Sequence, residues 1–276
     1  MKIFIDTSKL DEIKKAHAAG IFDGVTTNPT LIRAAVEAEK AKGTDIDIKE
    51  YITQILILSK GLPVSLEVIG NTYETMFEQG MMLYNIFNPI AENVYVKIPI
   101  NSSFDKTDAT DFDGIKTIKA LSDKGIPINC TLVFTPEQAL LAAKAGARFV
   151  SPFAGRIDDY IRSQSGISFS KGDYFPAEGQ KKNNILLEDN GIVSGVDLVA
   201  QIREVFDNYN INDTLVLAAS IRNPRQLREV ALAGADIATL PFSVIVKLLS
   251  HFKTREGMQK FTQDIVPEYA ELFKKQ

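Results

Sequence analysis

Apolar and β-branched residues gather in short runs along the chain, and stretches of helical periodicity separate them. Runs of this composition are typical of strands that are buried in a parallel sheet. Eight runs are predicted as strands: residues 3–6, 24–27, 63–68, 94–98, 126–133, 149–153, 214–220 and 237–241. Apolar positions recur at helical spacing over residues 8–19, from Pro29 onward, and over 73–87, 114–124, 136–145, 197–206 and 224–233. The chain therefore repeats one strand–helix unit.

The ends of the predicted helices carry local signals. Thr7 or Ser8 is placed to cap the first helix, Gly20 to end it, and Pro29 to open the next one. Eight strand–helix units predict an α/β fold of the closed (β/α)8 type, a TIM barrel. The alternative is an open doubly wound sheet, but no glycine-rich dinucleotide motif follows the first predicted strand.

Two connections and the C-terminal tail exceed this repeat. Residues 1–276 are predicted to form a single barrel domain, with 254–276 as a helical extension that caps the barrel or packs on another subunit. Connections 101–113 and 158–195 are longer than the roughly two to six residues usual in such folds. Both follow the C-terminal ends of strands, where barrels place their chemistry. They are either rims or lids over a site, or plain surface insertions.

Composition narrows the possible partners and the compartment. Apolar residues make up 45% and charged residues 24% of the chain, and the net charge of −4 gives no broad basic field for nucleic acid or an anionic membrane. Cys130 is the only cysteine, which excludes an intrachain disulfide and zinc sites built from several thiolates. No signal peptide or run of membrane-spanning length is found. These features predict a cytoplasmic protein.

Lys97 stands out because it lies inside a β-branched and apolar run, residues 94–100. Burial of an ammonium group is costly, so such a lysine is either paired or loses its proton. A neutral lysine amine attacks ketones and aldehydes to form Schiff bases. The alternative is a lysine whose charged end reaches water while its stem packs.

Polar residues also occur near the ends of most other predicted strands. They are Asp6, Thr26, Asn28, Glu67, Asn129, Thr131, Ser151 and Ser220. A barrel brings strand ends into one ring, so two carboxyl groups are expected near Lys97, an arrangement suited to proton transfer around a Schiff base. Taken singly, Asp6 is equally placed to cap a helix, Asn28 to close a turn, and Glu67 to form a structural ion pair.

Two arginines follow the sixth and seventh predicted strands. Arg156 and Arg222, with Ser220 nearby, indicate a phosphate site, because guanidinium groups match phosphate oxygens and late barrel loops commonly bind phosphate. A phosphorylated sugar is thus implied; the alternative is that both arginines form surface ion pairs. His17 and His251 lie away from strand ends and are interpreted as structural, and no His or Cys cluster suits a metal.

Motifs along nearly the whole chain resemble those of the transaldolase family, in the compact branch that also contains the fructose-6-phosphate aldolases. The motifs cover residues 4–7, 24–29, 64–68, 96–99, 129–134, 138–146, 150–153, 155–159, 217–224 and 234–239. Each motif is weak alone, but their shared order is a strong signal. The resemblance implies no metal or organic cofactor, and a homo-oligomer in the form of a pentamer or decamer.

The resemblance also implies a role for each matching residue. Lys97 would form the Schiff base and Asp6 would take the proton from the C4 hydroxyl. Glu67, Thr131 and a water would shuttle protons during imine formation. The substrate-binding positions would be Thr26, Asn28, Asn129, Ser151 and Phe153, and the phosphate-binding positions Arg156, Ser220 and Arg222.

Two of these positions separate the activities of the family. Aldolase members carry tyrosine at the place of Phe153 and glutamine at that of Glu67, so both residues here are of the transferase type. The resemblance thus favours transaldolase, which moves a dihydroxyacetone unit from a ketose phosphate, sedoheptulose 7-phosphate or fructose 6-phosphate, to an aldose phosphate in the non-oxidative pentose phosphate pathway. A cleaving aldolase and a non-catalytic barrel that binds phosphorylated sugars are the alternatives.

Overall fold

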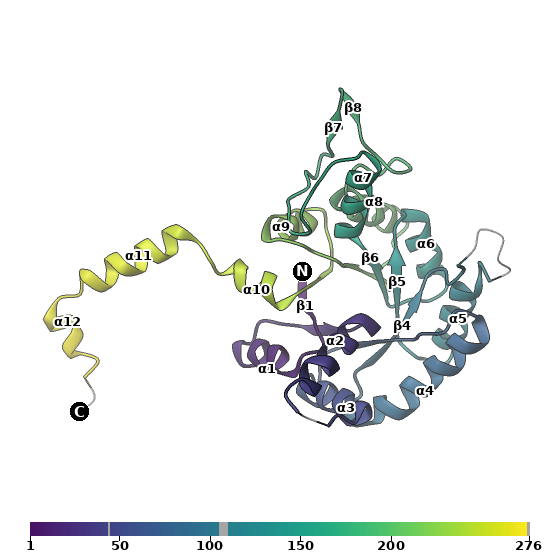
Figure 1. The fold of residues 1–276 in the computed structure, drawn as a ribbon, viewed down its shortest axis with the longest axis horizontal. Helices are drawn as coiled ribbons and strands as arrows, with labels where there is room; N and C mark the ends of the chain where they lie inside the picture. The colour runs from purple at the N-terminus through teal and green to yellow at the C-terminus, as the bar shows by residue number, and fades with distance from the viewer. Residues whose placement is uncertain (44, 105–109, 275–276) are drawn as a thin grey trace.

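Eight parallel strands close into a barrel. Helices surround these strands in Figure 1. The structure, a computed structural model, describes residues 1–43, 45–104 and 110–274. The strands follow the order β1-β10-β9-β6-β5-β4-β3-β2 around the barrel. They are β1 (Lys2–Asp6), β2 (Gly24–Thr26), β3 (Val64–Glu67), β4 (Val94–Pro99), β5 (Ile128–Val133), β6 (Phe149–Pro152), β9 (Leu215–Ala218) and β10 (Ile237–Leu240). The predicted (β/α)8 barrel is confirmed, and the open sheet is excluded.

The helices lie outside the strands and cover the barrel wall. They are α1 (Leu10–Ala19), α2 (Pro29–Lys40), α3 (Ile48–Leu58), α4 (Tyr73–Ala91), α5 (Asp113–Ser122), α6 (Pro136–Lys144), α7 (Ala154–Gln164), α8 (Gly195–Asn208), α9 (Pro224–Leu232) and α10 (Phe242–Leu248). Within the part of the chain that the structure describes, none of the helices is long and apolar enough to cross a membrane.

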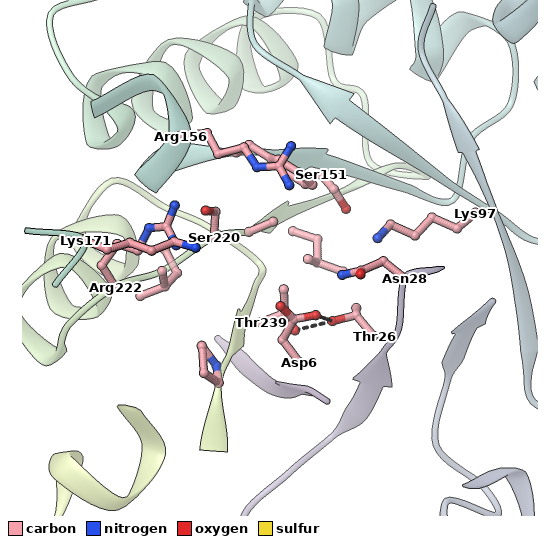
Figure 2. A pocket seen from close by; sticks show the side chains of 15 residues that line it. Asp6, Thr26, Asn28, Lys97, Ser151, Arg156, Lys171, Ser220, Arg222 and Thr239 are labelled. Atoms are coloured by element: carbon pink, nitrogen blue, oxygen red, sulfur yellow. Dashed lines mark hydrogen bonds between the residues drawn. The ribbon is translucent and has the colours of Figure 1, made fainter. Parts of the chain in front are cut away.

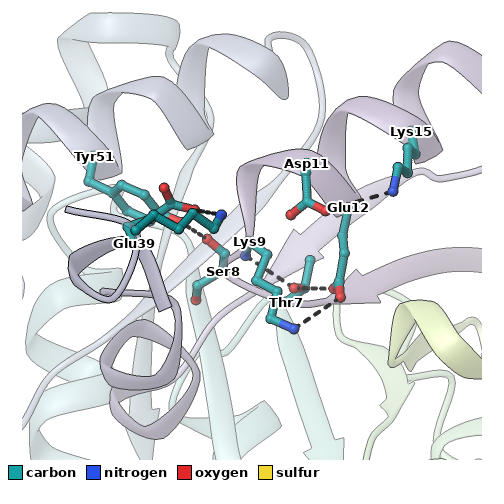
Figure 3. A network of polar contacts seen from close by, with 9 residues as sticks. Thr7, Ser8, Lys9, Asp11, Glu12, Lys15, Glu39 and Tyr51 are labelled. Carbon is teal, nitrogen blue, oxygen red and sulfur yellow. Dashed lines mark hydrogen bonds and ion pairs between the residues drawn. The ribbon is translucent and has the colours of Figure 1, made fainter. Parts of the chain in front are cut away.

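The first two units differ from the sequence prediction at α1 and α3. The residue that caps α1 is Lys9, with no side-chain cap, whereas Thr7 Oγ1 accepts a hydrogen bond from the Lys9 amide and donates to Glu12. Helix α3 was not predicted. The Tyr51 hydroxyl of α3 donates to the Ser8 carbonyl at 2.9 Å, which fixes α3 against the start of α1 (Figure 3).

The predicted connection 158–195 is partly helical, so the prediction of a loop over its whole length was wrong. Helix α7 continues to Gln164, and the inserted segment, residues 165–194, begins only after it. The inserted segment contains a short antiparallel hairpin, β7 (Lys181–Lys182) and β8 (Ile185–Leu186), which stands away from the barrel in Figure 1. In the other long connection, residues 105–109 lie outside the described residues, and α5 begins at Asp113.

Large apolar side chains fill the N-terminal part of the barrel interior. Phe4, Phe149 and Ile237 are buried together, and the Tyr95 ring stacks on Phe149 with centroids 4.6 Å apart. Gly24 makes room for this packing, because a Cβ at this position would lie 2.6 Å from the Phe4 ring. Since side chains two residues apart on a strand share a face, the residues two positions after these aromatics point into the same interior nearer the C-terminal mouth.

Cys130 lies on β5 on the opposite face of the barrel wall, within the apolar layer between strands and helices. It is fully buried, and burial raises the pKa of its thiol.

The C-terminal arm, defined here as residues 252–274, extends away from the barrel (Figure 1). It contains α11 (Phe252–Gln263) and α12 (Pro267–Glu271), neither of which has a buried residue. Its exposed apolar side chains are Phe252, Met258, Phe261, Ile265, Val266, Tyr269, Leu272 and Phe273. The helices of the arm therefore do not pack their apolar side chains against the barrel of the same chain.

Candidate active site

A cavity of about 170 Å³ opens at the C-terminal ends of the strands (Figure 2). Most of the predicted site residues line it: Asp6, Thr26, Asn28, Lys97, Ser151, Phe153, Arg156, Ser220 and Arg222. Three others, Glu67, Asn129 and Thr131, do not line it but lie on β3 and β5, the two neighbours of the Lys97 strand. The barrel thus brings together residues from most of its strands.

Lys97 is buried on β4, with 4% of its surface exposed. Its Nζ lies 3.0 Å from Glu67 Oε2 and donates a hydrogen bond to the Thr27 carbonyl at 3.2 Å. Glu67 and Lys97 are directly paired in the β3–β4 register, so the strand geometry fixes this contact. The amine faces the cavity rather than solvent, which excludes a surface-reaching lysine, and it has a carboxyl group within proton-transfer distance.

Asp6 lies across the cavity from Lys97, and hydrogen bonds link its carboxyl group to two threonine hydroxyls in series. Thr26 Oγ1 donates to Asp6 Oδ1 at 2.7 Å and is itself 2.6 Å from Thr239 Oγ1. Burial raises the pKa of the Asp6 carboxyl above its usual value, against the opposing effects of the Lys97 charge, the Thr26 hydrogen bond and the two arginines. Asp6 does not cap α1, so this alternative does not apply.

Thr239 was not predicted as a site residue, although strand alternation could have found it. It lies on β10 two residues after Ile237, at an inward position, and it lines the cavity. A hydroxyl inside a run of apolar residues is the signal.

Asn129 is held by two serines beneath the cavity. Its Nδ2 donates to Ser65 Oγ at 3.0 Å, and its Oδ1 accepts from Ser151 Oγ at 2.7 Å. The three side chains come from β3, β5 and β6 and are fully or almost fully buried. Ser65 was missed by the sequence analysis; its place two residues before Glu67 on the same strand face was the available signal.

Thr131 has a different environment from Asn129. Its Oγ1 is buried and has no hydrogen-bond partner among the described residues. The next residue, Leu132, has a φ of 58°, and the β5–β6 register shifts between Cys130 and Val133. Such irregularities reorient side chains at sites, and a buried hydroxyl without a protein partner requires water or a ligand.

Asn28 has two contributions. Its Oδ1 accepts a hydrogen bond from the Leu31 amide at 2.9 Å and thereby caps α2, while the residue also lines the cavity. Because the side-chain oxygen of Asn28 accepts the hydrogen bond from the helix, its side-chain NH2 group is the part available to a ligand.

The far end of the cavity is positively charged. Arg156, in the first turn of α7, lies over the Phe153 ring at 4.7 Å from its centroid. Arg222 donates to Asp159 Oδ2 at 2.9 Å, but its Nε is buried without a partner among the residues described. Arg222 therefore forms a partly exposed ion pair, as the alternative supposed, and still retains a donor for an anion.

Gly155 allows this end of the cavity to close up. A Cβ at this position would lie 2.1 Å from the Ser220 carbonyl oxygen and 2.6 Å from Arg222 Nε. Ser220 follows β9 and has a left-handed φ of 63°. The close approach of α7 to residues 220–222 thus depends on a residue without a side chain.

Lys171 also lines the cavity, and the sequence analysis missed it. It comes from the inserted segment, and Figure 2 labels it at the same end as Arg222 and Ser220. The inserted segment has no regular pattern of apolar residues, so its sequence does not indicate that one of its lysines lies at the barrel mouth.

The two histidines lie outside the cavity lining. His17 is on the exposed face of α1, and His251 Nδ1 accepts a hydrogen bond from the Lys253 amide as the cap of α11. Both positions agree with structural roles. Over the described ranges, no group of three or more His, Cys, Asp and Glu side chains suits a metal ion.

A closed (β/α)8 barrel holds a buried lysine, two carboxyl groups and two arginines at its C-terminal mouth, an arrangement suited to enzymatic chemistry at a lysine amine. The sequence model of one family, described as Transaldolase/Fructose-6-phosphate aldolase, matches residues 3–276, and the chain belongs to this family.

Relatives at about two-fifths identity carry consistent names. A probable transaldolase of Chlorobaculum parvum is 43% identical over 264 residues, which cover 96% of this chain and 97% of the relative. A probable transaldolase of Leptospira biflexa is 40% identical over the same shares. One of Aquifex aeolicus is 41% identical over 96% of each chain. The predicted family is therefore confirmed.

Proposed function

We propose that this protein is a transaldolase that transfers a dihydroxyacetone unit between phosphorylated sugars through a Schiff base on Lys97. The observation that carries the proposal is the buried Lys97 amine, which is 3.0 Å from Glu67 and shares a cavity with Asp6 and two arginines. The proposed donors are sedoheptulose 7-phosphate and fructose 6-phosphate, of the non-oxidative pentose phosphate pathway. Family membership and the names of the relatives support this reaction.

Imine formation requires an unprotonated amine. Glu67 Oε2 accepts a proton from Lys97 Nζ, and the nitrogen lone pair then attacks the C2 carbonyl carbon of the ketose. Glu67 returns this proton to the C2 oxygen, which becomes a hydroxyl, and then carries a second proton from the nitrogen to that hydroxyl, which leaves as water as the C=N bond of the iminium forms. The unpartnered Thr131 hydroxyl is on the neighbouring strand, where it would bind the water that carries these protons.

Cleavage follows from the position of Asp6. Its carboxylate takes the C4 hydroxyl proton, the C4–O bond becomes a carbonyl, and the C3–C4 bonding electrons move into the iminium to form an enamine on Lys97. An aldose phosphate leaves. The enamine carbon then attacks the aldehyde of a second aldose phosphate, Asp6 returns its proton to the new hydroxyl, and water releases the product from Lys97.

The remaining cavity residues fit the binding of such a sugar. The Asn28 amide and the Ser151 hydroxyl lie near Lys97, where the dihydroxyacetone hydroxyls would be bound, with Ser151 held by Asn129. Thr26 orients Asp6, and the Phe153 ring forms an apolar wall. Arg156, Ser220 and Arg222 would bind the phosphate at the other end.

Trapping of the imine tests the proposal directly. Incubation with fructose 6-phosphate and borohydride is expected to fix a dihydroxyacetone adduct on Lys97, detected by peptide mass spectrometry. Lys97→Met, which keeps most of the apolar stem, is expected to give no adduct while keeping its thermal stability. Lys171→Ala is the matched control that removes another cavity lysine and should still label. Sugar binding by the wild-type protein without any adduct would instead support a non-catalytic phosphosugar-binding barrel.

A cleaving aldolase is the second candidate, since the family description includes fructose-6-phosphate aldolase. The two reactions differ in what the enamine accepts. Fast release of dihydroxyacetone from fructose 6-phosphate without an acceptor aldehyde would favour the aldolase. The expected result is slow release that Phe153→Tyr accelerates, because a hydroxyl at this position would help to protonate the enamine. Phe153→Leu controls for the altered packing.

The remaining proposals concern the whole protein. We propose that residues 1–276 form one barrel domain whose extension, residues 254–276, reaches another subunit of a homo-oligomer, a pentamer or decamer. The exposed apolar side chains of the C-terminal arm support this contact. A cytoplasmic location is also proposed, and the single buried cysteine is compatible with a reducing compartment.

A further inference from the structure

Lys171 reaches the catalytic cavity although it lies outside the barrel repeat. It lines the same cavity as Lys97, Arg156, Ser220 and Arg222. In Figure 2 its amine points into the cavity beside Ser220 and Arg222, at the end opposite Lys97. The inserted segment therefore contributes one side chain to the positively charged end of the site.

A tight turn holds Lys171 in this place. The Asp173 amide donates to the Ser170 carbonyl at 2.9 Å, and the Ser170 amide donates to Asp173 Oδ2 at 2.7 Å. Lys171 and Gly172 are the two central residues of this turn. The reciprocal hydrogen bonds fix the backbone from which the lysine side chain starts.

Contacts with α7 hold this turn in place. The Arg162 guanidinium, buried on α7, lies over the Phe169 ring at 4.9 Å and over the Phe175 ring at 5.0 Å, and it donates to the Asp173 carbonyl at 3.1 Å. Phe169 and Phe175 flank the turn on both sides. Since α7 also carries Arg156, one helix positions both Arg156 and Lys171.

The charges at this end match a phosphate dianion. Arg222 is paired with Asp159, whereas neither Arg156 nor Lys171 has a carboxylate within ion-pair distance in the described part of the chain. Two uncompensated positive charges therefore face one end of the cavity. A phosphate monoester carries nearly two negative charges at neutral pH. Without Lys171, only one of these charges would remain to balance it.

We propose that Lys171 is a specificity-determining residue that binds the phosphate group of the sugar together with Arg156, Ser220 and Arg222. The inference rests on the proposed function, which supplies the sugar phosphate. It assigns to the inserted segment the task of adding a third cation to the anion site. As the Lys171 side chain is exposed, its contribution is smaller than that of a buried arginine and is sensitive to salt.

The test compares donors with and without phosphate. Lys171→Ala is expected to raise the KM for fructose 6-phosphate about fivefold, and the ratio of kcat/KM for fructose 6-phosphate to that for fructose is expected to fall by the same factor. Lys171→Arg should retain the wild-type ratio. The effect should diminish as the salt concentration is raised.

Lys181→Ala is the matched control, because Lys181 is exposed on the same inserted segment but does not line the cavity. It makes the same change in net charge and is expected to leave the ratio unchanged. A fall of equal size in both variants, or none in Lys171→Ala, would overturn the proposal.

Binding of inorganic phosphate, measured by titration calorimetry, tests Lys171 without turnover. A weaker affinity in Lys171→Ala alone supports the inference even if the proposed reaction proves wrong. Equal affinity in wild type and Lys171→Ala refutes the inference even if Lys97 traps the sugar.

Discussion

At the scale of single residues, the two carboxyl groups near Lys97 differ in what they contact. Glu67 is an ion-pair partner of the amine, whereas Asp6 accepts its hydrogen bond from Thr26. A carboxyl group that contacts the amine suits proton exchange with nitrogen, and one held by hydroxyls across the cavity suits exchange with a sugar oxygen. The environments of the two side chains therefore assign them to different steps of the proposed reaction.

Thr26→Val should change the pH dependence of the reaction. The Thr26 hydroxyl favours the ionised form of Asp6, so its removal is expected to raise the already raised pKa of Asp6 further. Since the base form is lost as pH falls through this pKa, the acidic limb of kcat/KM should move to higher pH by about one unit. Thr27→Val is the control, because the Thr27 hydroxyl donates to the Ser65 carbonyl instead. An unmoved acidic limb in Thr26→Val would show that Asp6 is not the base.

The sequence predicted the chemically distinctive residues of the cavity but not their supports. A lysine or glutamate in an apolar strand is conspicuous because its burial is costly. Ser65 and Thr239 are small and are compatible with a buried strand, so their hydroxyl groups are weaker signals than a buried charge. Lys171 lies on an irregular segment, whose path depends on the Arg162 contacts and not on a repeating pattern.

At the scale of elements, α7 combines several contacts of the site. Its start approaches Ser220, its first turn carries Arg156, and Arg162 anchors the inserted segment. Its middle contributes Asp158, whose oxygens accept hydrogen bonds from the Gly195 amide of α8 and from Gln226 of α9, both at 2.7 Å. A shift of this helix would therefore disturb the phosphate end of the cavity and two neighbouring helices together.

Gly155→Ala tests the approach of α7 to residues 220–222. The added methyl group would overlap the Ser220 carbonyl and Arg222, so the helix start must move. The expected results are a KM for fructose 6-phosphate raised about tenfold and a thermal midpoint lowered by a few degrees, from steady-state kinetics and calorimetry. Gly172→Ala is the matched control, since no atom lies within 4 Å of its added Cβ. Similar kinetics in both variants would contradict this account.

Asp158 makes the stability depend on pH. Burial raises the pKa of its carboxyl to about 7, above the usual 3.8, so the folded protein holds a proton that the unfolded chain releases between these values. The free energy of unfolding should therefore fall by up to about 1.4 kcal/mol per pH unit as pH rises from 4 to 7. Denaturant unfolding of wild type and Asp158→Asn would measure this slope, which is expected to be shallower in the variant. Asp159→Asn, at the adjacent position, is the control; equal slopes in all three proteins would exclude Asp158 as the cause.

Element prediction failed where buried charges replaced apolar residues. Asp158 and Arg162 lie on the inner face of α7, so the apolar periodicity is interrupted over the second half of a real helix. The glycines and proline that follow strengthened the impression of a loop. The eight barrel strands, by contrast, were recognisable because both faces of each strand are enclosed and their apolar runs are nearly continuous.

At the scale of the whole molecule, the barrel and the C-terminal arm differ in how they are stabilised. The barrel encloses a continuous core, whereas the arm has no buried residue. Apolar side chains on an isolated helix gain stability only when another surface covers them. The arm is thus the expected contact with a second copy of the chain.

Removal of residues 252–276 is expected to yield a smaller species that keeps the folded barrel. The reason is that the described residues of this segment, 252–274, carry exposed apolar side chains and none of the core. Light scattering coupled to gel filtration would give the mass, and circular dichroism would report the fold. Phe261→Asp in the full chain should also yield a smaller species, whereas Lys260→Asp, at the preceding position, should not. A full-length protein that is already monomeric would refute the proposed oligomer.

Cys130 gives this barrel an intrinsic reporter of its own opening. The lone thiol is sealed between β5 and the surrounding helices, one residue before Thr131, so alkylating reagents gain access only when that part of the wall separates. The rate of thiol labelling therefore measures how often this part of the barrel, next to the Lys97 strand, opens locally, and no engineered probe is needed. Ligands that bind in the cavity and stabilise the barrel wall are expected to lower the rate of Cys130 labelling.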